Sequence, residues 1–239
     1  MCIRDRAQLS FNDDILASDF LARISTPARN GLLLLGEPSA GLAGFLEQCV
    51  HPVVLLDLPG DGSVDVVTID NHQGISLAFD HLYELGHRKI GFVGRLDDNF
   101  AYAERYTTFK WKMAEAGLTV REDWSYSGLA QVDASAARMR EVLRSDDRPT
   151  ALLCSNDWVA LGAIRAASDL GISVPDQLSI IGFDDIEAAA IVTPPLTTIH
   201  VPVDEIGRRG VRQLMIQMRQ PQRDDAAAIR GCRIRLEGE

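Results

Sequence analysis

Short apolar segments alternate with segments of helical periodicity along most of the chain, and this alternation constrains the fold more than any other feature. Residues 52–57 and 150–155 are centred on continuous apolar runs of strand length. Residues 75–85 and 158–170 carry apolar side chains at helical spacing, and each segment is followed by a glycine that can end a helix. Continuous apolar strands separated by helices are typical of parallel sheets covered on both faces. The pattern therefore predicts an α/β protein with doubly wound parallel sheets.

The remaining elements follow the same alternation, and a length of 239 residues suits one large or two small globular units. Strands are predicted at residues 31–36, 52–57, 64–70, 89–94, 150–155, 178–184, 196–201 and 229–236. Helices are predicted at residues 75–85, 106–116, 133–143, 158–170 and 204–218.

Composition excludes several classes of protein. Apolar residues make up 46% of the chain, which is enough for a core and excludes a disordered chain. The 24 Lys and Arg residues are outnumbered by 34 Asp and Glu residues, giving a net charge of −10. An acidic chain repels phosphate, so these residues alone are predicted to bind DNA and RNA poorly. No apolar run approaches the roughly 18–20 residues that cross a bilayer.

The cysteines indicate a reducing compartment. They stand at positions 2, 49, 154 and 232, too far apart for a Cys-x-x-Cys pair or a zinc knuckle. Residues 1–6 lack the apolar region of a signal peptide and fit neither a strand nor a helix start, so we interpret them as an assembly remnant. We therefore expect a cytoplasmic protein with no membrane partner.

Motifs for catalysis and for cofactors are missing from the sequence. Gly36 and Gly41 are spaced like the glycines of a phosphate loop, but Leu42 and Ala43 stand where that loop needs lysine and a hydroxyl. There is no Gly-x-Gly-x-x-Gly fingerprint, no Gly-x-Ser-x-Gly elbow and no histidine pair with metal-ligand spacing. We therefore predict that the chain is not an enzyme and holds neither a cofactor nor a metal ion.

Polar residues follow many of the predicted strands, and ligands of doubly wound sheets lie outside the carboxyl ends of the strands. A single acid in this position has a second interpretation, because it can instead cap the next helix. Several such ends that converge on one cleft would form a site. These ends carry Asp57, Asp70, Gly94-Arg95, Asn156-Asp157 and Asp184-Asp185.

Four segments carry motifs that are weak singly and specific together. They span residues 70–94, 105–117, 149–162 and 171–199, and include Leu85-Gly86-His87-Arg88, Cys154-Ser155-Asn156-Asp157 and Gly182-Phe183-Asp184-Asp185. In this order and spacing the chain resembles, over residues 8–236, the effector-binding domain of the LacI/GalR family of bacterial transcription regulators. One departure is Thr108, where the family has glycine.

The resemblance implies a periplasmic-binding-protein-like fold of type I, with two doubly wound lobes, three crossovers and a ligand cleft. The expected lobes are residues 7–95 with 201–220, and residues 96–200 with 221–239. The family's helix-turn-helix head and hinge helix are not matched. The first β-α unit of the first lobe is not matched either, so residues 7–11 and 15–24 would form the second strand and its helix.

The resemblance also implies a set of effector-binding residues, which include an arginine fork, strand-end amides and carboxylates, and an apolar face. The alternative for Arg105 is a salt bridge that fixes its helix, and the alternative for Asn156 is an N-cap. At position 129 a leucine stands where some members have an aromatic platform. The implied residues are Asn99, Arg105, Leu129, Asn156, Asp157, Phe183 and Asp184.

These expectations lead to one functional hypothesis and two alternatives. The hypothesis is the ligand-sensing, homodimeric domain of a LacI/GalR-type regulator, which binds a small sugar-like polyol or a nucleobase and reaches operator DNA only through its helix-turn-helix head. The first alternative is a solute-binding protein of a sugar transporter. The second is an enzyme on a Rossmann-like sheet, which would need a cofactor loop or a nucleophile with its base.

Overall fold

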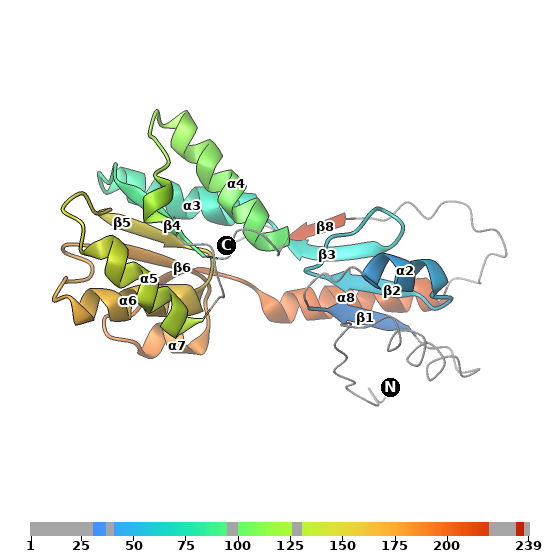
Figure 1. Ribbon diagram of the computed structural model, residues 1–239. Coiled ribbons are helices and arrows are strands. Elements are labelled where there is room, and N and C mark those ends of the chain that lie inside the picture. The colour runs from blue at the N-terminus through green and yellow to red at the C-terminus, as the bar shows by residue number, and fades with distance from the viewer. Residues whose placement is uncertain (1–30, 37–40, 95–99, 126–130, 220–232, 237–239) are drawn as a thin grey trace. The chain divides into compact units, whose positions relative to one another are not determined.

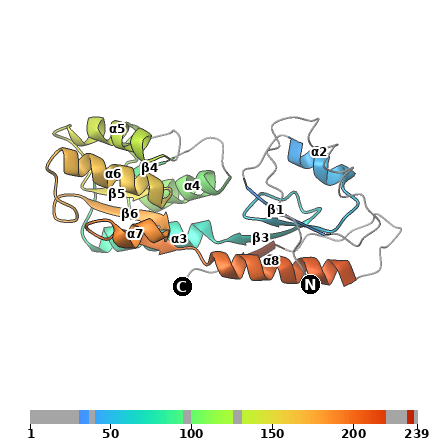
Figure 2. The ribbon, with the colours of Figure 1, turned by 90° about the horizontal axis from the view of Figure 1, so that it is seen from below.

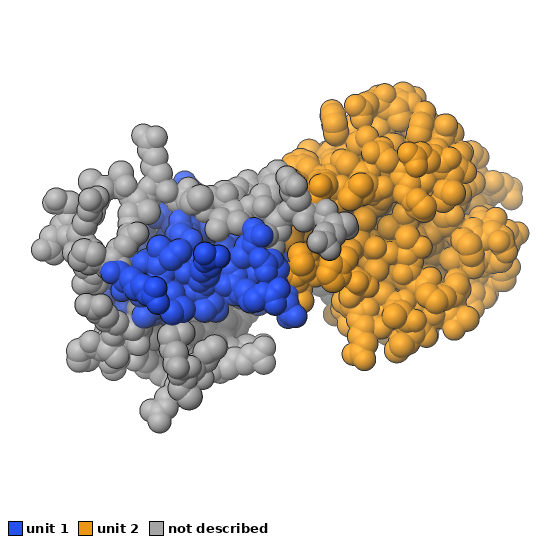
Figure 3. Space-filling model, turned by 180° about the vertical axis from the view of Figure 1, so that it is seen from behind, with its two compact units in different colours: residues 1–68, 204–234 blue, residues 69–203, 235–239 orange. Residues whose placement is uncertain are grey.

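The computed structural model describes residues 31–36, 41–94, 100–125, 131–219 and 233–236, and Figure 1 shows its elements. The chain divides into two compact units, residues 1–68 with 204–234 and residues 69–203 with 235–239, which are coloured separately in Figure 3. The segments predicted at 7–11 and 15–24 lie outside the described residues.

The second unit is built on a parallel sheet, which confirms the predicted fold class. Its strands are β4 (Ile90–Val93), β5 (Ala151–Cys154), β6 (Ser179–Asp184) and β7 (Thr197–His200), in the order β4-β5-β6-β7. All three strand pairs are parallel. Every residue of β4 and β5 is buried, which is why these strands are continuous apolar runs in the sequence.

Helices cover both faces of this sheet (Figure 1). On one face lie α3 (Asn71–Glu84) and α4 (Phe100–Glu115), and Phe79, Phe92 and Phe109 pack there as buried aromatic contacts. On the other face lie α5 (Val132–Leu143) and α6 (Asp157–Asp169). The absence of a side chain at Gly162 lets these two helices approach closely. A Cβ there would stand 2.6 Å from Ser135 Cβ. Two short elements complete the unit: η1 (Glu122–Trp124) and α7 (Glu187–Ile191).

The first unit has a sheet of its own, in the order β1-β2-β3-β8. The strands are β1 (Leu32–Leu35), β2 (Val53–Leu56), β3 (Asp65–Ile69) and β8 (Arg233–Leu236). Figure 2 shows α2 (Gly41–Gln48) and α8 (Val203–Arg219) on opposite faces of this sheet. Asp65 is buried and accepts hydrogen bonds from Gln213 and Gln217 of α8, which fixes that helix on the sheet. None of the helices in the described ranges combines the length and the apolar character that a membrane crossing needs.

The first boundary between the units differs from the expected one. The sequence placed it at 95/96, whereas the structure places it at 68/69. The physical reason is strand pairing, because β4 hydrogen-bonds to β5 and α3 packs on the same sheet. Residues 69–94 therefore belong to the second unit. The return at 203/204 lies close to the expected 200/201.

Candidate functional site

The carboxyl edge of the second unit's sheet is organised around one arginine. Arg105 projects from α4 and is 3% exposed. Its Nη1 donates to the carbonyl oxygen of Ser155 at 2.5 Å, and its Nε donates to Asn71 Oδ1 at 2.8 Å. Asp184 Oδ1, at the end of β6, lies 3.4 Å from the same Nη1. The arginine therefore joins the ends of two strands to the start of α3.

An aromatic ring supports the guanidinium from one side. Arg105 Cζ lies 3.6 Å from the centroid of the Phe183 ring. Phe183 is itself 1% exposed and packs against Gly74, where a Cβ would stand 2.7 Å from the ring. Phe183 thus holds Arg105 from below and has almost no surface for a ligand. Among the described residues no hydrogen bond engages Nη2 of Arg105, which leaves the two N–H donors of that nitrogen for a bound molecule.

Asn71 is a part of this cluster that the sequence did not assign to the site. It is completely buried, and its Nδ2 donates to Glu104 Oε2 at 3.0 Å while its Oδ1 accepts from Arg105. The preceding Asp70 caps α3 by accepting from Gln73 N at 3.0 Å. The cap interpretation of this strand-end acid is therefore correct, and the residue after it provides the contact with the arginine.

Asn156 reaches the cluster through a tyrosine. Its Oδ1 accepts from Val159 N at 2.9 Å, so it is an N-cap of α6. Its Nδ2 donates to the hydroxyl of Tyr102 at 3.0 Å. Tyr102 is half-buried on α4, and its ring centroid lies 5.6 Å from Arg105 Cζ. The sequence signal for Tyr102 was its spacing of one helical turn from Arg105, which places both on one face.

Asp157 serves the fold and lies apart from the arginine cluster. It has no exposed surface, its Oδ1 accepts from the Thr198 hydroxyl at 2.6 Å, and its Oδ2 accepts from Ile186 N at 2.8 Å. Burial raises the pKa of this carboxyl. The neighbouring Gly182 leaves room for it, since a Cβ there would stand 2.1 Å from Oδ1. Asp157 therefore connects the start of α6 to β7 and to the loop before α7.

The backbone is strained where β6 ends. Asp184 has φ 110° and Asp185 has φ 57°, values that L residues rarely adopt. The side chain of Asp184 is 34% exposed, so it faces both Arg105 and solvent. Asp185 Oδ2 lies 2.8 Å from His200 Nδ1. Strain of this kind is concentrated at binding and catalytic sites.

The hydroxyl of Ser155 is buried at the end of β5. Among the described residues Ser155 Oγ has no hydrogen-bond partner, although the residue is completely buried. It lies against Gly94, where a Cβ would stand 1.8 Å from the hydroxyl oxygen. An unpartnered buried hydroxyl is costly, so this edge of the sheet is not optimised for stability.

The structure thus brings together part of the predicted set. Arg105, Phe183 and Asp184 are in contact, Asn156 joins them through Tyr102, and Asp157 is engaged elsewhere. The two other predicted residues, Asn99 and Leu129, lie outside the described residues. In the described part of the chain no three His, Cys, Asp or Glu side chains gather as metal ligands.

Comparisons with known proteins give a consistent result. A family model described as a periplasmic binding protein-like domain matches residues 79–235. The HTH-type transcriptional repressor PurR of Haemophilus influenzae (strain PittEE) is 40% identical over 165 residues, which is 69% of this chain and 49% of the relative. The chain spans about half the length of the curated relatives that it matches at this level.

Solved structures share the fold over nearly the whole chain. A regulatory protein of the LacI family from Chloroflexus aggregans has a TM-score of 0.80 and 26% identity, covering 94% of this chain and 79% of that one. The complex of the transcriptional regulator CelR with cellobiose has a TM-score of 0.82 and 26% identity, covering 95% of this chain and 69% of that one.

Proposed function

The chain belongs to the periplasmic binding protein-like family, as an effector-binding domain of the LacI/GalR type, and on this basis we propose that it senses a small sugar-like effector for a transcription regulator. Effector binding would change the affinity of the regulator's helix-turn-helix head for operator DNA. A coupling of about 1–3 kcal/mol between the two sites is typical of such regulation. A regulator of this kind acts in the cytoplasm, where the operator is.

The observation that carries the proposal is the arrangement of Arg105. The guanidinium is held on Phe183 and by Asn71 and Ser155, with Nη2 not engaged by the described residues. Asp184 adds a partly exposed carboxylate at 3.4 Å from Nη1. A donor pair beside an acceptor matches adjacent hydroxyl groups, each of which both donates and accepts a hydrogen bond. Sugars and related polyols present such hydroxyl pairs.

Thermal denaturation with ligands tests this function directly. The probes are D-ribose, cellobiose and the nucleobase hypoxanthine, added to the full chain. A ligand present at a hundred times its dissociation constant adds about 2.7 kcal/mol to the free energy of unfolding. We expect a shift in Tm with at least one sugar. If none of the probes shifts Tm, and calorimetry detects no binding, the proposed function is wrong.

Two variants then locate the site. Asp184→Asn keeps the side-chain shape and tolerates the left-handed backbone, but removes the charge. We expect the apparent affinity for the ligand to fall at least tenfold in this variant. Arg105→Met should abolish the shift. Arg140→Met is the matched control, because Arg140 pairs with Asp169 on the outer surface of α5 and α6. If the site variants bind like the Arg140 control, Arg105 and Asp184 do not form the site.

The alternative of a solute-binding protein shares the fold and the site. The matching relatives and structures named above are all transcriptional regulators, and this supports the regulator. Their identity also supports a binding protein over an enzyme. A homodimer is part of the proposal, and sedimentation velocity of the purified chain measures it.

A further inference from the structure

We propose that Tyr102 provides an aromatic wall for a sugar ring, and that Asn156 acts by holding Tyr102 in place instead of contacting the effector. This inference rests on the proposed function and specifies the ligand class of the same site. It assigns to Asn156 a positioning role and to Tyr102 the direct contact. The ligand class is a cyclic sugar with one apolar face, as opposed to an open-chain polyol.

The first step of the argument is that both polar ends of Asn156 are engaged. Oδ1 accepts from Val159 N at 2.9 Å, and Nδ2 donates to the Tyr102 hydroxyl at 3.0 Å. The side chain is buried, with 3% exposure for the whole residue. One of the two N–H donors of Nδ2 and one of the two lone pairs of Oδ1 are already used, so a ligand could reach only the second of each. Asn156 is therefore better placed to orient its partners than to bind a hydroxyl of the effector.

The second step is the position of Tyr102 itself. It lies one helical turn before Arg105 on α4, so the two side chains lie on the same face of the helix. Its ring centroid is 5.6 Å from Arg105 Cζ, whereas Phe183 covers that guanidinium at 3.6 Å. Phe183 is 1% exposed and Tyr102 is half-buried. Of these two rings, only Tyr102 has substantial surface for a ligand.

The third step is chemical. An aromatic ring fixed beside an arginine fork and a carboxylate offers one flat apolar face and several polar groups, which is the combination that small-molecule sites use for orientation. A sugar ring has C–H groups on one face that pack on such a wall, while its hydroxyls reach Arg105 and Asp184. An open-chain polyol has the hydroxyls without a rigid face. The hydroxyl anchor from Asn156 fixes the ring orientation before binding and so reduces the entropy cost.

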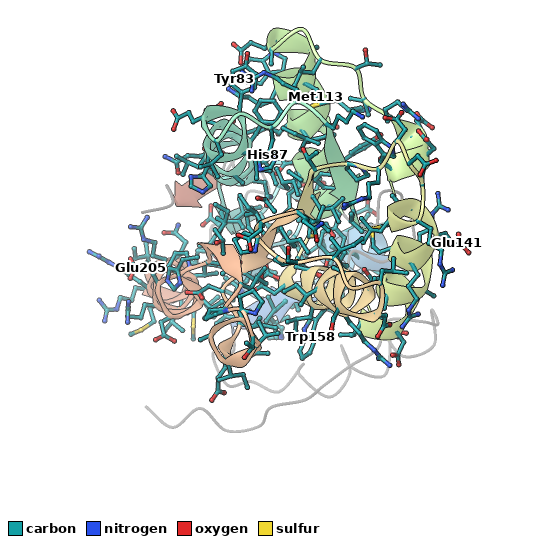
Figure 4. The ribbon with its side chains drawn as sticks, turned by 90° about the vertical axis from the view of Figure 1, so that its left-hand side faces the viewer. Tyr83, His87, Met113, Glu141, Trp158 and Glu205 are labelled. Atoms are coloured by element: carbon teal, nitrogen blue, oxygen red, sulfur yellow. The ribbon has the colours of Figure 1, made fainter. Side chains whose placement is uncertain are left out.

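The test compares cyclic sugars with their open-chain counterparts. D-ribose is paired with ribitol, and D-glucose with D-glucitol, in isothermal titration calorimetry on the full chain. We expect the wild-type chain to prefer the cyclic member of the pair that it binds by at least tenfold. Tyr102→Leu should weaken binding of the cyclic sugar about tenfold and leave the open-chain polyol nearly unchanged. Tyr83→Leu, on α3 and packed under Arg88, is the matched control and should change neither (Figure 4).

The role of Asn156 is tested by a double-mutant cycle. Asn156→Ser keeps a capping oxygen for α6 and removes the bond to Tyr102, and Tyr102→Phe removes the same bond from the other side. We expect each to weaken ring binding two- to fivefold, and the double variant to be no weaker than the single ones. Effects that multiply in the double variant would show that Asn156 contacts the ligand by itself, and would overturn the assignment.

The outcomes separate this inference from the proposed function. If the wild-type chain binds none of the probes, the proposed function fails and this inference with it. If the wild-type chain binds a cyclic sugar and Tyr102→Leu leaves the ratio of cyclic to open-chain affinity unchanged, only the present inference fails. Binding of hypoxanthine without either sugar would overturn the ligand class. Urea denaturation of each variant shows whether a loss of binding reflects a loss of folded protein.

Discussion

At the carboxyl edge of the second unit's sheet the charged side chain of Arg105 is 3% exposed, whereas at the amino edge of the same strands Lys89 and Asp147 are 50% and 51% exposed. The carboxyl edge also holds two residues with positive φ, Asp184 and Asp185. Ser155 adds a buried hydroxyl with no partner among the described residues. Each of these features costs free energy of folding.

At the amino edge the described residues with positive φ are glycines, and the buried atom without a hydrogen-bond partner there is Nη1 of Arg148. Lys89 Nζ lies 2.6 Å from Asp147 Oδ1, and Arg121 Nη1 lies 2.8 Å from Asp147 Oδ2. His87 connects the starts of β5 and β6, with ring nitrogens 2.9 Å from the hydroxyls of Thr150 and Ser179. Burial lowers the pKa of His87.

The difference shows how one sheet can separate stability from binding. Its amino edge is held mostly by exposed ion pairs, and its carboxyl edge carries backbone strain and polar groups that a ligand can use. The general rule that sites of doubly wound sheets lie at the carboxyl ends agrees with this asymmetry. If the comparison is correct, substitutions at the two edges should change the free energy of unfolding by different amounts, and in some cases with opposite sign.

The largest effect is expected for Gly94→Ala at the end of β4. A Cβ there would stand 1.8 Å from Ser155 Oγ and 2.2 Å from Ser155 Cβ, and φ is +154°. Overpacking and backbone strain together should lower the free energy of unfolding by about 3–5 kcal/mol in urea denaturation. Gly117→Ala is the control, because φ is +68° there with open space around it, and only about 1 kcal/mol should be lost.

A second substitution, Ser155→Gly, tests the cause of that loss. Ser155→Gly removes both clashing atoms, so the double variant of Gly94→Ala and Ser155→Gly should recover more than half of the lost stability. A double variant that is as unstable as Gly94→Ala alone would mean that the close approach of β4 and β5 is not what limits position 94.

The next effect is expected for Asp157→Ala, which leaves the Thr198 hydroxyl and Ile186 N without their acceptor. Two half-buried donors without partners should lower the free energy of unfolding by about 1–3 kcal/mol, with binding of sugar retained in the folded fraction. Loss of sugar binding with an unchanged fold would return Asp157 to the site, as the sequence had suggested.

The pH dependence of Asp157 has a defined sign. Its pKa is raised by burial, so the folded chain binds this proton more tightly than the unfolded chain. The contribution to stability is therefore largest below the ordinary pKa of 3.8 and is lost as pH rises through the raised value. The wild-type chain should gain stability relative to Asp157→Asn as pH is lowered from 7 towards 4. A difference that is constant over this range would contradict the raised pKa.

The regular elements were predictable because buried parallel strands are continuous apolar runs in the sequence. β4, β5 and β6 were predicted within two residues of their observed bounds. The start of α4 was missed, since it begins at Phe100 and was predicted at 106. Its first turns bury Ala101 and Arg105, so they show no apolar periodicity. Arg105 packs on Phe183 and bonds to Asn71, which are distant in sequence.

The site residues were predictable only by type. Arg105 followed from the resemblance alone and Asp184 from a strand end and the resemblance, and the structure brings them together. The separate roles of Asn156 and Asp157 did not follow, because they depend on partners far along the chain, Tyr102 and Thr198. A sequence shows which side chains can hydrogen-bond, and only the fold determines which of them are already engaged.

A smaller effect of opposite sign is expected for Ser155→Ala. The hydroxyl is buried without a partner among the described residues, so its removal relieves a desolvation cost and leaves the backbone bond to Arg105 in place. Thermal denaturation should show an unchanged or higher Tm, with a gain of up to about 1 kcal/mol. The control is Ser135→Ala, whose hydroxyl donates to Val159 O at 2.8 Å and whose loss should be destabilising. Equal destabilisation by both variants would mean that the buried hydroxyl of Ser155 does not cost free energy of folding.

The smallest effect is expected for Asp147→Asn at the amino edge. Hydrogen bonds from Lys89 and then Arg121 lower the pKa of Asp147, so its contribution is present above the ordinary value of 3.8 and is lost as pH falls through the lowered one. Exposed pairs are screened by salt and contribute little, so the stability difference between wild type and variant should shrink in 1 M NaCl. It should shrink in the same way when pH is lowered below 3.8. A loss as large as that of Asp157→Ala, insensitive to salt, would mean that the amino edge depends on its charges as strongly as the carboxyl edge depends on its buried ones.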